Sequence, residues 1–170
     1  MKKLVTIVTL TTLLGTAYRF APRNADLPPD LQYSRADRLS YIGQVLVASK
    51  ISSVLSLQIM PTWVHRNMVD QTIEKNNQWA LGLGGRLKIS PSVAFTVDYY
   101  YRINPVVSDP YHNALGFGID IETGGHVFQL VITNTRGLTE RSFVAETLDT
   151  FMNGGIHLGF NVTRAFQVNH

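Results

Sequence analysis

The sequence predicts an all-β fold, an antiparallel up-and-down transmembrane β-barrel of about eight strands. Three observations predict it. Apolar side chains occupy every second position in successive segments that are mostly about ten residues or longer. The positions between them carry small residues and charges of both signs. The connections that join the segments are short and long in turn.

Length and composition set the limits. The chain has 170 residues, and we expect a single β-barrel domain over residues 1–170. Charged residues make up 16% of the chain, below the roughly 25% typical of soluble domains. No run of about 20 apolar residues could form a transmembrane helix. The chain has no cysteine, which excludes a disulfide scaffold or a thiolate metal site. The net charge of +3 is scattered without a basic stripe, which argues against nucleic acid as a partner.

Two interpretations fit the N-terminal segment, MKKLVTIVTLTTLLGTA. Two lysines, an apolar stretch and small residues resemble a secretory signal peptide. The alternation of Val5 and Ile7 with their neighbours predicts instead a first strand at about 4–14. Residues 1–17 are therefore either the first strand or a signal peptide.

Seven further segments alternate apolar and polar side chains, with the period of two that strands have. We expect strands at 41–49, 53–65, 77–89, 93–103, 114–123, 126–135 and 156–166. Most are long enough for a tilted strand to cross a bilayer. With the N-terminal strand the count is eight, an even number that can close as a barrel. Pro61 cannot donate to a strand ladder, so we expect a bulge or a local edge there.

The connections alternate in length. Lys50–Ser52, Ser90–Ser92 and Gly124–Gly125 are short, and the glycine pair suits a two-residue hairpin. The connections 15–40, 66–76, 104–113 and 136–155 are long. In outer-membrane barrels the short turns face the periplasm and the long loops face outside. The C-terminus falls on the short-turn side, which favours location in a bacterial outer membrane.

The direction of the apolar face decides between two kinds of barrel. A soluble lipocalin-like barrel, which binds a ligand inside, alternates in the same way with its apolar face inward. Here the polar face is rich in glycine and alanine and carries charges of both signs, which suits a crowded barrel interior. We therefore expect the apolar face to contact lipid. The residues expected to line the lumen are Gln58, Gln78, Arg86, Lys88, Asp98, Arg102, Asp120, Glu122, His157 and Asn161.

Large aromatic side chains lie on the apolar face toward the strand ends, as in the interfacial girdles of membrane barrels. The residues expected to form the girdle are Trp63, Trp79, Tyr99, Tyr101, Phe128, Phe160 and Phe166.

The long external loop at 136–155 contains a candidate helical segment. Residues 139–148 could form a short helical turn, with Phe143 and Leu148 packing over or into the barrel mouth. The loop is then either an external lid or docking element, or a long loop that its own apolar residues hold together.

Several stretches together resemble an uncharacterised β-barrel family of bacterial outer-membrane-type proteins, a domain of unknown function. They are Leu57–Asn67, Ala80–Arg86, His126–Leu130, Thr133–Gly137 and Gly159–Arg164. The resemblance implies a barrel in a Gram-negative envelope and implies no activity. Members of the family are longer, so the chain is similar to their C-terminal portion. It either closes with eight strands or forms part of a larger barrel.

The last segment resembles the C-terminal signal that the barrel assembly machinery reads. It alternates toward an aromatic residue, Phe166, although Arg164 stands where an apolar residue is expected. The partners expected are therefore the lipid bilayer with its lipopolysaccharide, the barrel assembly machinery, and an envelope protein or a further copy of the chain.

Three functions follow from these patterns. The first is a structural or anchoring outer-membrane barrel with a narrow charged lumen, and the second is a porin-like channel for small solutes. The third is the soluble ligand-binding barrel. Ser142, Glu146 and His126 or His157 could form a hydrolase group, but nothing in their spacing requires it. We predict no enzyme activity, no catalytic residues, no metal site and no cofactor.

Overall fold

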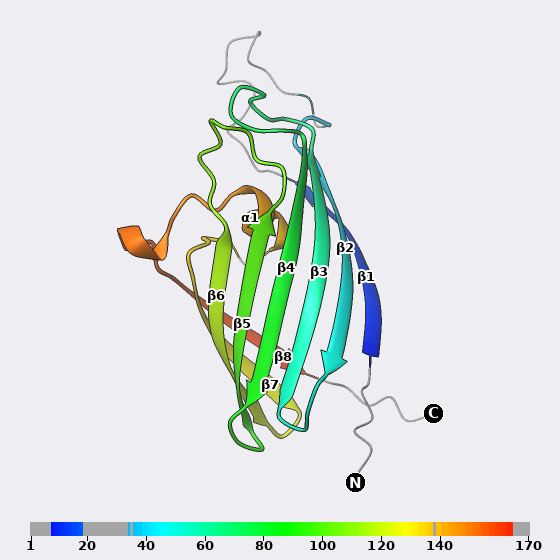
Figure 1. Cartoon of the computed structure of the whole chain (residues 1–170), viewed down its shortest axis with the longest axis vertical. Helices are drawn as coiled ribbons and strands as arrows, with labels where there is room; N and C mark the ends of the chain where they lie inside the picture. The colour runs from blue at the N-terminus through cyan, green and yellow to red at the C-terminus, as the bar shows by residue number, and fades with distance from the viewer. Residues whose placement is uncertain (1–7, 19–33, 35, 138, 165–170) are drawn as a thin grey trace.

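The computed structural model describes residues 8–18, 34, 36–137 and 139–164, whose strands form one antiparallel sheet (Figure 1). Eight strands lie side by side in their order along the chain, and the sheet curves into a half-barrel. The strands are β1 (Val8–Tyr18), β2 (Leu39–Lys50), β3 (Leu55–Arg66), β4 (Asn77–Lys88), β5 (Val93–Arg102), β6 (Ala114–Thr123), β7 (His126–Thr133) and β8 (His157–Arg164). The predicted all-β, up-and-down antiparallel fold is confirmed.

The N-terminal segment forms a strand, but later than the interpretation as a strand at 4–14 had it. β1 covers Val8–Tyr18 and pairs along its whole length with β2. β2 reaches back to Leu39, which offers Tyr18 a pairing partner beyond the expected end of the first strand. No helix among the described residues is long and apolar enough to cross a membrane.

Short turns lie at one end of the sheet and long loops at the other (Figure 1). At the short-turn end Gly124 and Gly125 have φ of 54° and 86°, a left-handed conformation that suits a tight hairpin between β6 and β7. At the long-loop end β7 and β8 are joined by residues 134–156, which contain helix α1 (Glu140–Ala145) and the 3-10 helix η3 (Phe151–Asn153). We call residues 134–156 the inner loop.

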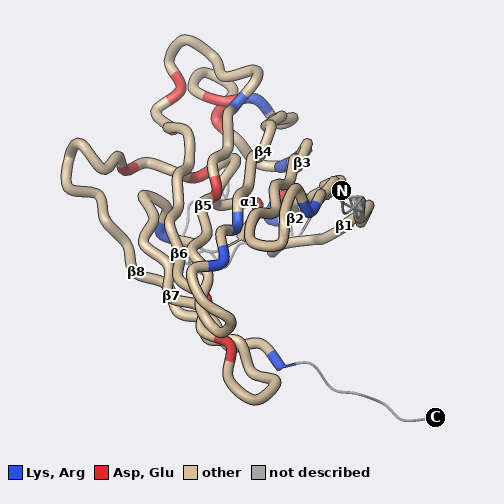
Figure 2. The backbone as a smooth tube through the Cα atoms, turned by 60° about the horizontal axis from the view of Figure 1, so that its bottom comes forward, with Lys and Arg blue, Asp and Glu red and all other residues tan. Residues whose placement is uncertain are grey.

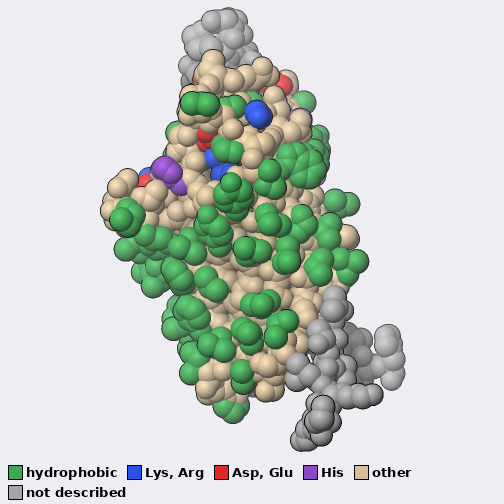
Figure 3. Space-filling view, viewed as in Figure 1, with side chains coloured by type: hydrophobic (Ala, Val, Ile, Leu, Met, Phe, Trp, Pro, Cys, Tyr) green, Lys and Arg blue, Asp and Glu red, His purple; other side chains and the backbone are tan. Residues whose placement is uncertain are grey.

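The alternation separates two chemically different faces. On the convex outer face the apolar side chains of β3, β4 and β7 are exposed, among them Ile59 at 49%, Leu83 at 45% and Leu130 at 52%. Figure 3 shows hydrophobic side chains spread over the front of this face. On the concave inner face polar side chains are buried, such as Gln44 and Thr62, which are 4% and 1% exposed. Gln44 Nε2 donates to Thr62 Oγ1 at 2.8 Å. The apolar face therefore points outward, as expected of a barrel in lipid and opposite to a lipocalin-like barrel.

Among the described residues the sheet is open at both edges. β1 pairs with β2 and β8 pairs with β7, and no pairing joins β1 to β8. Closure with eight strands, one of the two alternatives expected from the sequence, is therefore not observed. The half-barrel agrees with the other alternative, part of a larger barrel.

Pro61 interrupts one ladder without forming a bulge. The ladder between β2 and β3 has partners Gln44–Thr62 and Val47–Ile59 in one unbroken register, with no pair between them. On its other side Pro61 pairs with Leu81 of β4. Proline lacks an N–H that could donate to β2. The local edge expected at Pro61 is therefore this short break in the pairing with β2.

A substitution at Gly82 tests how closely the inner face is packed. A Cβ at Gly82 would lie 2.8 Å from Tyr100 Cε1 and 3.0 Å from Met60 Cβ. We expect Gly82→Ala to lower the free energy of unfolding by about 1–3 kcal/mol, because crowding displaces packed side chains. Urea titration in detergent, followed by tryptophan fluorescence, measures the change.

Gly116→Ala is the matched control for Gly82→Ala. Gly116 lies on the same face, but a Cβ there would meet nothing nearer than Thr133 Cβ at 3.7 Å. We expect it to be neutral or to stabilise slightly, since alanine restricts the unfolded chain. Equal losses in the two variants would contradict the packing seen at Gly82.

Candidate functional site

The inner loop forms a helix because its sequence supplies a cap. The Thr139 side chain accepts a hydrogen bond from the Ser142 backbone N–H, and Glu140 places an acidic side chain in the first turn. The helix ends at Ala145, and Glu146 follows as its C-cap. The short helical turn expected within residues 139–148 is thus α1.

Helix α1 packs against the inner face of the half-barrel (Figure 1). It contacts β3, β4 and β5, and its Val144 and Ala145 side chains are fully buried. The ring of Phe143 stacks on that of Tyr100, with centroids 5.5 Å apart. The apolar cluster under the helix consists of Ile42, Met60, Val64, Ala80, Tyr100, Ala114, Val144 and Ala145. The loop therefore enters the barrel mouth and is held there by apolar burial.

Leu148 is half-exposed, at 51%, and lines a hollow with Tyr111 and Glu146 of the mouth, so it lies over the mouth rather than within it. The chain leaves helical geometry after Ala145, and the Thr147 side chain turns inward instead, with 1% of its surface exposed. Thr147 Oγ1 lies 2.7 Å from Thr135 Oγ1. The buried position at this end of the loop is therefore taken by Thr147, the neighbour of Leu148.

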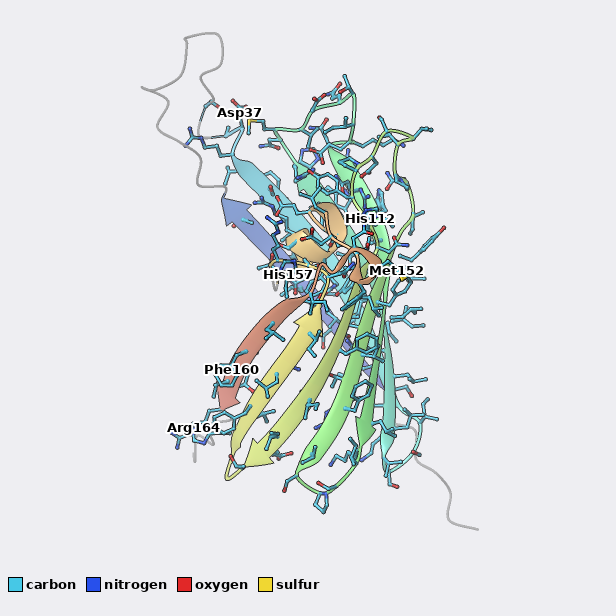
Figure 4. All side chains as sticks on the ribbon, turned by 90° about the vertical axis from the view of Figure 1, so that its left-hand side faces the viewer. Asp37, His112, Met152, His157, Phe160 and Arg164 are labelled. Atoms are coloured by element: carbon cyan, nitrogen blue, oxygen red, sulfur yellow. The ribbon has the colours of Figure 1, made fainter. Side chains whose placement is uncertain are left out.

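Polar contacts fix both ends of the inner loop to the sheet. Asn134 Nδ2 donates to the backbone oxygens of Asn113 and Asp149, each at 3.0 Å. Asp149 Oδ2 lies 2.8 Å from His157 Nε2 and 3.1 Å from Arg136 Nε. His157, labelled in Figure 4, is the first residue of β8, so its contact with Asp149 joins the end of the loop to the edge strand.

A group of charged side chains fills the mouth beside α1, and we call it the mouth cluster. It consists of Arg66, Glu74, Arg102, Asp109, Tyr111, Arg141 and Glu146. Arg66 of β3 pairs with Glu74 of the β3–β4 loop, and both side chains are nearly fully buried. Arg66 Nη1 also lies 3.6 Å from Glu146, which pairs in turn with Arg141 of α1. Figure 2 shows charged positions of strands and loops close together inside the curve of the sheet.

Arg102 joins a second loop to this cluster. Its two Nη atoms donate to the two carboxylate oxygens of Asp109 at 2.9 and 2.6 Å, a bidentate geometry. Its Nη2 also donates to Gln78 Oε1 at 3.2 Å. The ring of Tyr111 lies 5.8 Å from the guanidinium carbon of Arg66 and 5.6 Å from that of Arg102. Three loops thus converge on the mouth, and each supplies a partner for a buried arginine.

The lower half of the inner face is more open. Arg86 Nε donates to Asp120 Oδ2 at 3.1 Å, and Gln129 Nε2 donates to Asp120 Oδ1 at 2.8 Å. This chain of contacts spans β4, β6 and β7 and joins charges of opposite sign on the inner face. Beside it lies a hollow of about 240 Å³, lined in part by Gln58, Arg86 and Asp98.

The chain matches a family described as a membrane-bound beta barrel domain of unknown function (DUF5777) over residues 2–166. The chain belongs to this family. No curated protein and no solved structure matches it significantly. The family match confirms the predicted resemblance and a membrane β-barrel, and it carries no specific activity.

In this membrane-bound barrel domain the ten residues expected to line the lumen all lie on the inward phase of their strands. They occupy three levels. Gln78 and Arg102 are buried at the mouth. Arg86 and Asp98 line the lower hollow, and Asp120 pairs with Arg86 beside it. Lys88 and Glu122 are exposed at the short-turn end of β4 and β6. Gln58, His157 and Asn161 complete the set, the last two on the open edge strand.

The expected girdle residues of the described chain lie on the outward phase. Trp63 and Trp79 are cross-strand partners near the long-loop end, with ring centroids 6.3 Å apart. Trp63 Nε1 donates to Asn77 Oδ1 at 3.1 Å, and Tyr101 is 54% exposed. Tyr99 and Tyr101 continue this belt on β5, and Phe128 and Phe160 stack with centroids 6.4 Å apart. Phe166 lies outside the described residues.

The hydroxyl and acidic groups named for catalysis are engaged elsewhere in the barrel domain. Ser142 Oγ lies 3.1 Å from Thr139 Oγ1 at the helix cap, and Glu146 pairs with Arg66 and Arg141. His157 pairs with Asp149. Within the described ranges no three His, Asp or Glu side chains gather as a metal site. The absence of enzyme activity stays a prediction.

Sequence reasoning missed the apolar patch that seats α1 and the acidic partners of the mouth. Met60 and Val64 stand at inward positions of β3, where the polar face was expected. Two apolar residues on the inner row were the available signal that something packs there. Glu74 and Asp109 lie in loops, and nothing local in the sequence connects them to Arg66 and Arg102.

Val144→Asp should release the inner loop. The substitution places an unpaired carboxylate where the side chain is fully buried, which costs about 1–3 kcal/mol. We expect trypsin to cleave after Arg141 about tenfold or more faster in detergent, since that energy shifts the loop toward an open state. Met152→Asp, in the same loop at a side chain that is 95% exposed, is the control and should leave the rate unchanged. Unchanged cleavage in both variants would contradict the seating of α1.

The pKa of Asp149 predicts how the stability of the inner loop changes with pH. The hydrogen bond from His157, and then that from Arg136, holds the pKa of Asp149 below its ordinary value of 3.8. A carboxyl whose pKa is lowered on folding stabilises the fold above 3.8 and loses that contribution as pH falls through the lowered value. We expect amide exchange in residues 149–156, corrected for intrinsic rates, to accelerate below pH 3.8. Asp149→Asn should show faster exchange at neutral pH and no such acid step.

Proposed function

We propose that this chain is an integral outer-membrane β-barrel protein with a structural or anchoring role, whose narrow charged lumen is blocked by its own inner loop. The observation that carries the proposal is the fully buried seat of Val144 and Ala145 on the inner wall. A surface lid on an open pore would expose one face of its helix to the channel. Here the helix fills the mouth together with the arginine pairs of β3 and β5.

Three features support the outer membrane as the location. The outer face is apolar, the strands are 8 to 12 residues long, and long loops and short turns lie at opposite ends. β8 runs toward the short-turn end, as the last strand of such barrels does. The tryptophan and tyrosine belt at the long-loop end would then lie at the lipopolysaccharide headgroups, and β8 would be the strand that the barrel assembly machinery reads.

An anchoring role assigns the partner-binding surface to the long loops. Residues 103–113 project beyond the sheet and carry Val107, whose side chain is fully exposed. We expect no catalysis and no cofactor in this role, and an envelope protein as the partner.

A second candidate function, a channel for small solutes, is favoured by one observation: the sheet is open. If further strands complete the wall, the lumen widens and the inner loop blocks only part of it. Arg86, Asp98 and Arg102 would then face a conducting path.

Planar bilayer recordings distinguish the two functions. If the lumen is blocked, the wild-type protein gives no steady conductance, and deletion of residues 139–150 opens one, because α1 and its contacts are removed. If the protein is a channel, the wild type conducts and Arg102→Ala alters its ion selectivity, because a fixed positive charge is lost. Val107→Ser, at a fully exposed loop residue, controls for nonspecific change. Silent recordings from the deletion variant would contradict a lumen blocked by the loop.

A further inference from the structure

We propose that the lower half of the inner face binds a small organic cation, a primary ammonium held by the carboxylate of Asp98. Two hollows of about 240 and 340 Å³ lie on this part of the half-barrel, and Thr96, Asp98 and Gln129 line both. Asp98 therefore borders each of them. The site goes beyond the structural role proposed above and rests on these hollows, whether or not the lumen conducts.

The Asp98 carboxylate has no partner in the part of the chain that the structure describes. No described side chain forms an ion pair with it, and it accepts no hydrogen bond from the described residues. Arg86 lines the first hollow with it, but Arg86 Nε donates to Asp120 at 3.1 Å instead. Asp98 lies half-buried in the middle of β5. An ionisable side chain at membrane depth is costly, and where it faces a cavity it marks a site for a ligand or an ion.

Glycines on both neighbouring strands leave this carboxylate uncovered. Asp98 pairs with Gly84 of β4 on one side and with Gly116 of β6 on the other. Gly84 lines the first hollow and Gly116 lines the second. A Cβ at Gly84 would lie 2.8 Å from Asp98 Oδ1 and 2.6 Å from Gln58 Cγ, so a larger residue would displace both side chains. The missing side chains therefore give a ligand access to Asp98.

The amides that line the hollows are left to accept hydrogen bonds. Gln58 Nε2 donates to Met60 Sδ at 3.0 Å, and Gln129 Nε2 donates to Asp120 Oδ1 at 2.8 Å. Both amide nitrogens are engaged, and both amide oxygens lack a donor among the described residues. An ammonium group carries three N–H donors and no acceptor. It therefore matches a site made of carboxylate and amide oxygens.

The charge of the hollows also favours a cation. Arg86 and Asp120 compensate each other, which leaves the negative charge of Asp98 without compensation. Lys88, the next inward residue of β4, is exposed at the short-turn end and lines neither hollow. Phe143 of α1 lines the second hollow, and an aromatic ring stabilises a cation near its face. An anion would be repelled by Asp98.

Helix α1 closes the site at the end nearer the long loops. Its Phe143 lines the second hollow, whereas Ser56 and Arg86, close to the short-turn ends of β3 and β4, line the first. A ligand therefore enters from the short-turn end (Figure 1), which the proposed function places in the periplasm. The volumes lie at the lower end of those of ligand pockets, which fits a molecule of a few heavy atoms.

Saturation-transfer NMR in deuterated detergent tests the site with matched probes. Ethanolamine, ethylene glycol and glycolate have similar size and carry a positive charge, no charge and a negative charge at neutral pH. We expect ethanolamine to bind the wild type about tenfold or more tightly than ethylene glycol, since the diol lacks the charged hydrogen bond to Asp98. Glycolate should not bind.

Two variants separate the Asp98 carboxylate from the general charge of the inner face. Asp98→Asn keeps the size of the side chain and removes its charge, so it should weaken ethanolamine binding by about tenfold or more. Glu122→Gln removes the same charge from an exposed position near the end of β6 and should change the affinity by less than about twofold. Asp98→Asn should not lower the midpoint of urea unfolding, because no partner is lost. A purely structural carboxylate would lower it.

Three results would overturn the proposal. They are the absence of saturation transfer from the wild type to ethanolamine, equal affinities for ethanolamine and ethylene glycol, and equal affinities of the wild type and Asp98→Asn for ethanolamine. If Asp98→Asn does not fold, as heat-dependent gel mobility would show, the comparison of probes on the wild type still decides. Conductance is a separate readout. A conducting wild type that binds ethanolamine overturns the blocked lumen alone, and a silent one that does not bind it overturns this site alone.

Discussion

The satisfaction of backbone hydrogen bonds without water is the constraint on which the rest of this structure depends. A strand in lipid must pair on both sides, and its side chains must then divide between lipid and lumen. The continuous ladders meet the first requirement for β2 to β7, and the two-residue alternation meets the second. Even the proline in β3 keeps the register on both of its sides, so that one missing donor does not shift the faces of the strand.

The inner face follows from the same constraint. Once apolar side chains face lipid, the remaining positions face one another across a confined space and must be small, paired or covered. Gly82 brings its backbone against Tyr100 and Met60, and the Asp120 carboxylate accepts hydrogen bonds from Arg86 and Gln129. At the mouth, the acidic partners of Arg66 and Arg102 come from the loops that return to them. The loops are therefore part of the interior and complete its electrostatics.

The sequence predicts features that depend on residues close together along the chain, and it does not predict contacts between residues far apart along it. Strand positions, the Gly124–Gly125 hairpin and the outward apolar face depend on neighbours within a few residues, so period and turn chemistry were sufficient for them. The helix could be expected from residues 139–148, but its seat could not, because Val64 and Tyr100 lie far from it along the chain. The pairs of Arg66 with Glu74 and of Arg102 with Asp109 depend on how whole loops fold back. Whether Leu148 lies over or within the mouth could not be predicted, because apolar character alone does not show which way an extended segment turns.

Helix α1 connects the chemistry of the mouth to the curve of the sheet. A helix seated on β3, β4 and β5 requires a wall of lower curvature than eight strands would give if they closed around their own side chains. The half-barrel of the described strands leaves this room on its inner face. The apolar patch under α1, which includes Met60 and Val64, is therefore covered without drawing the strands into a narrow closed barrel.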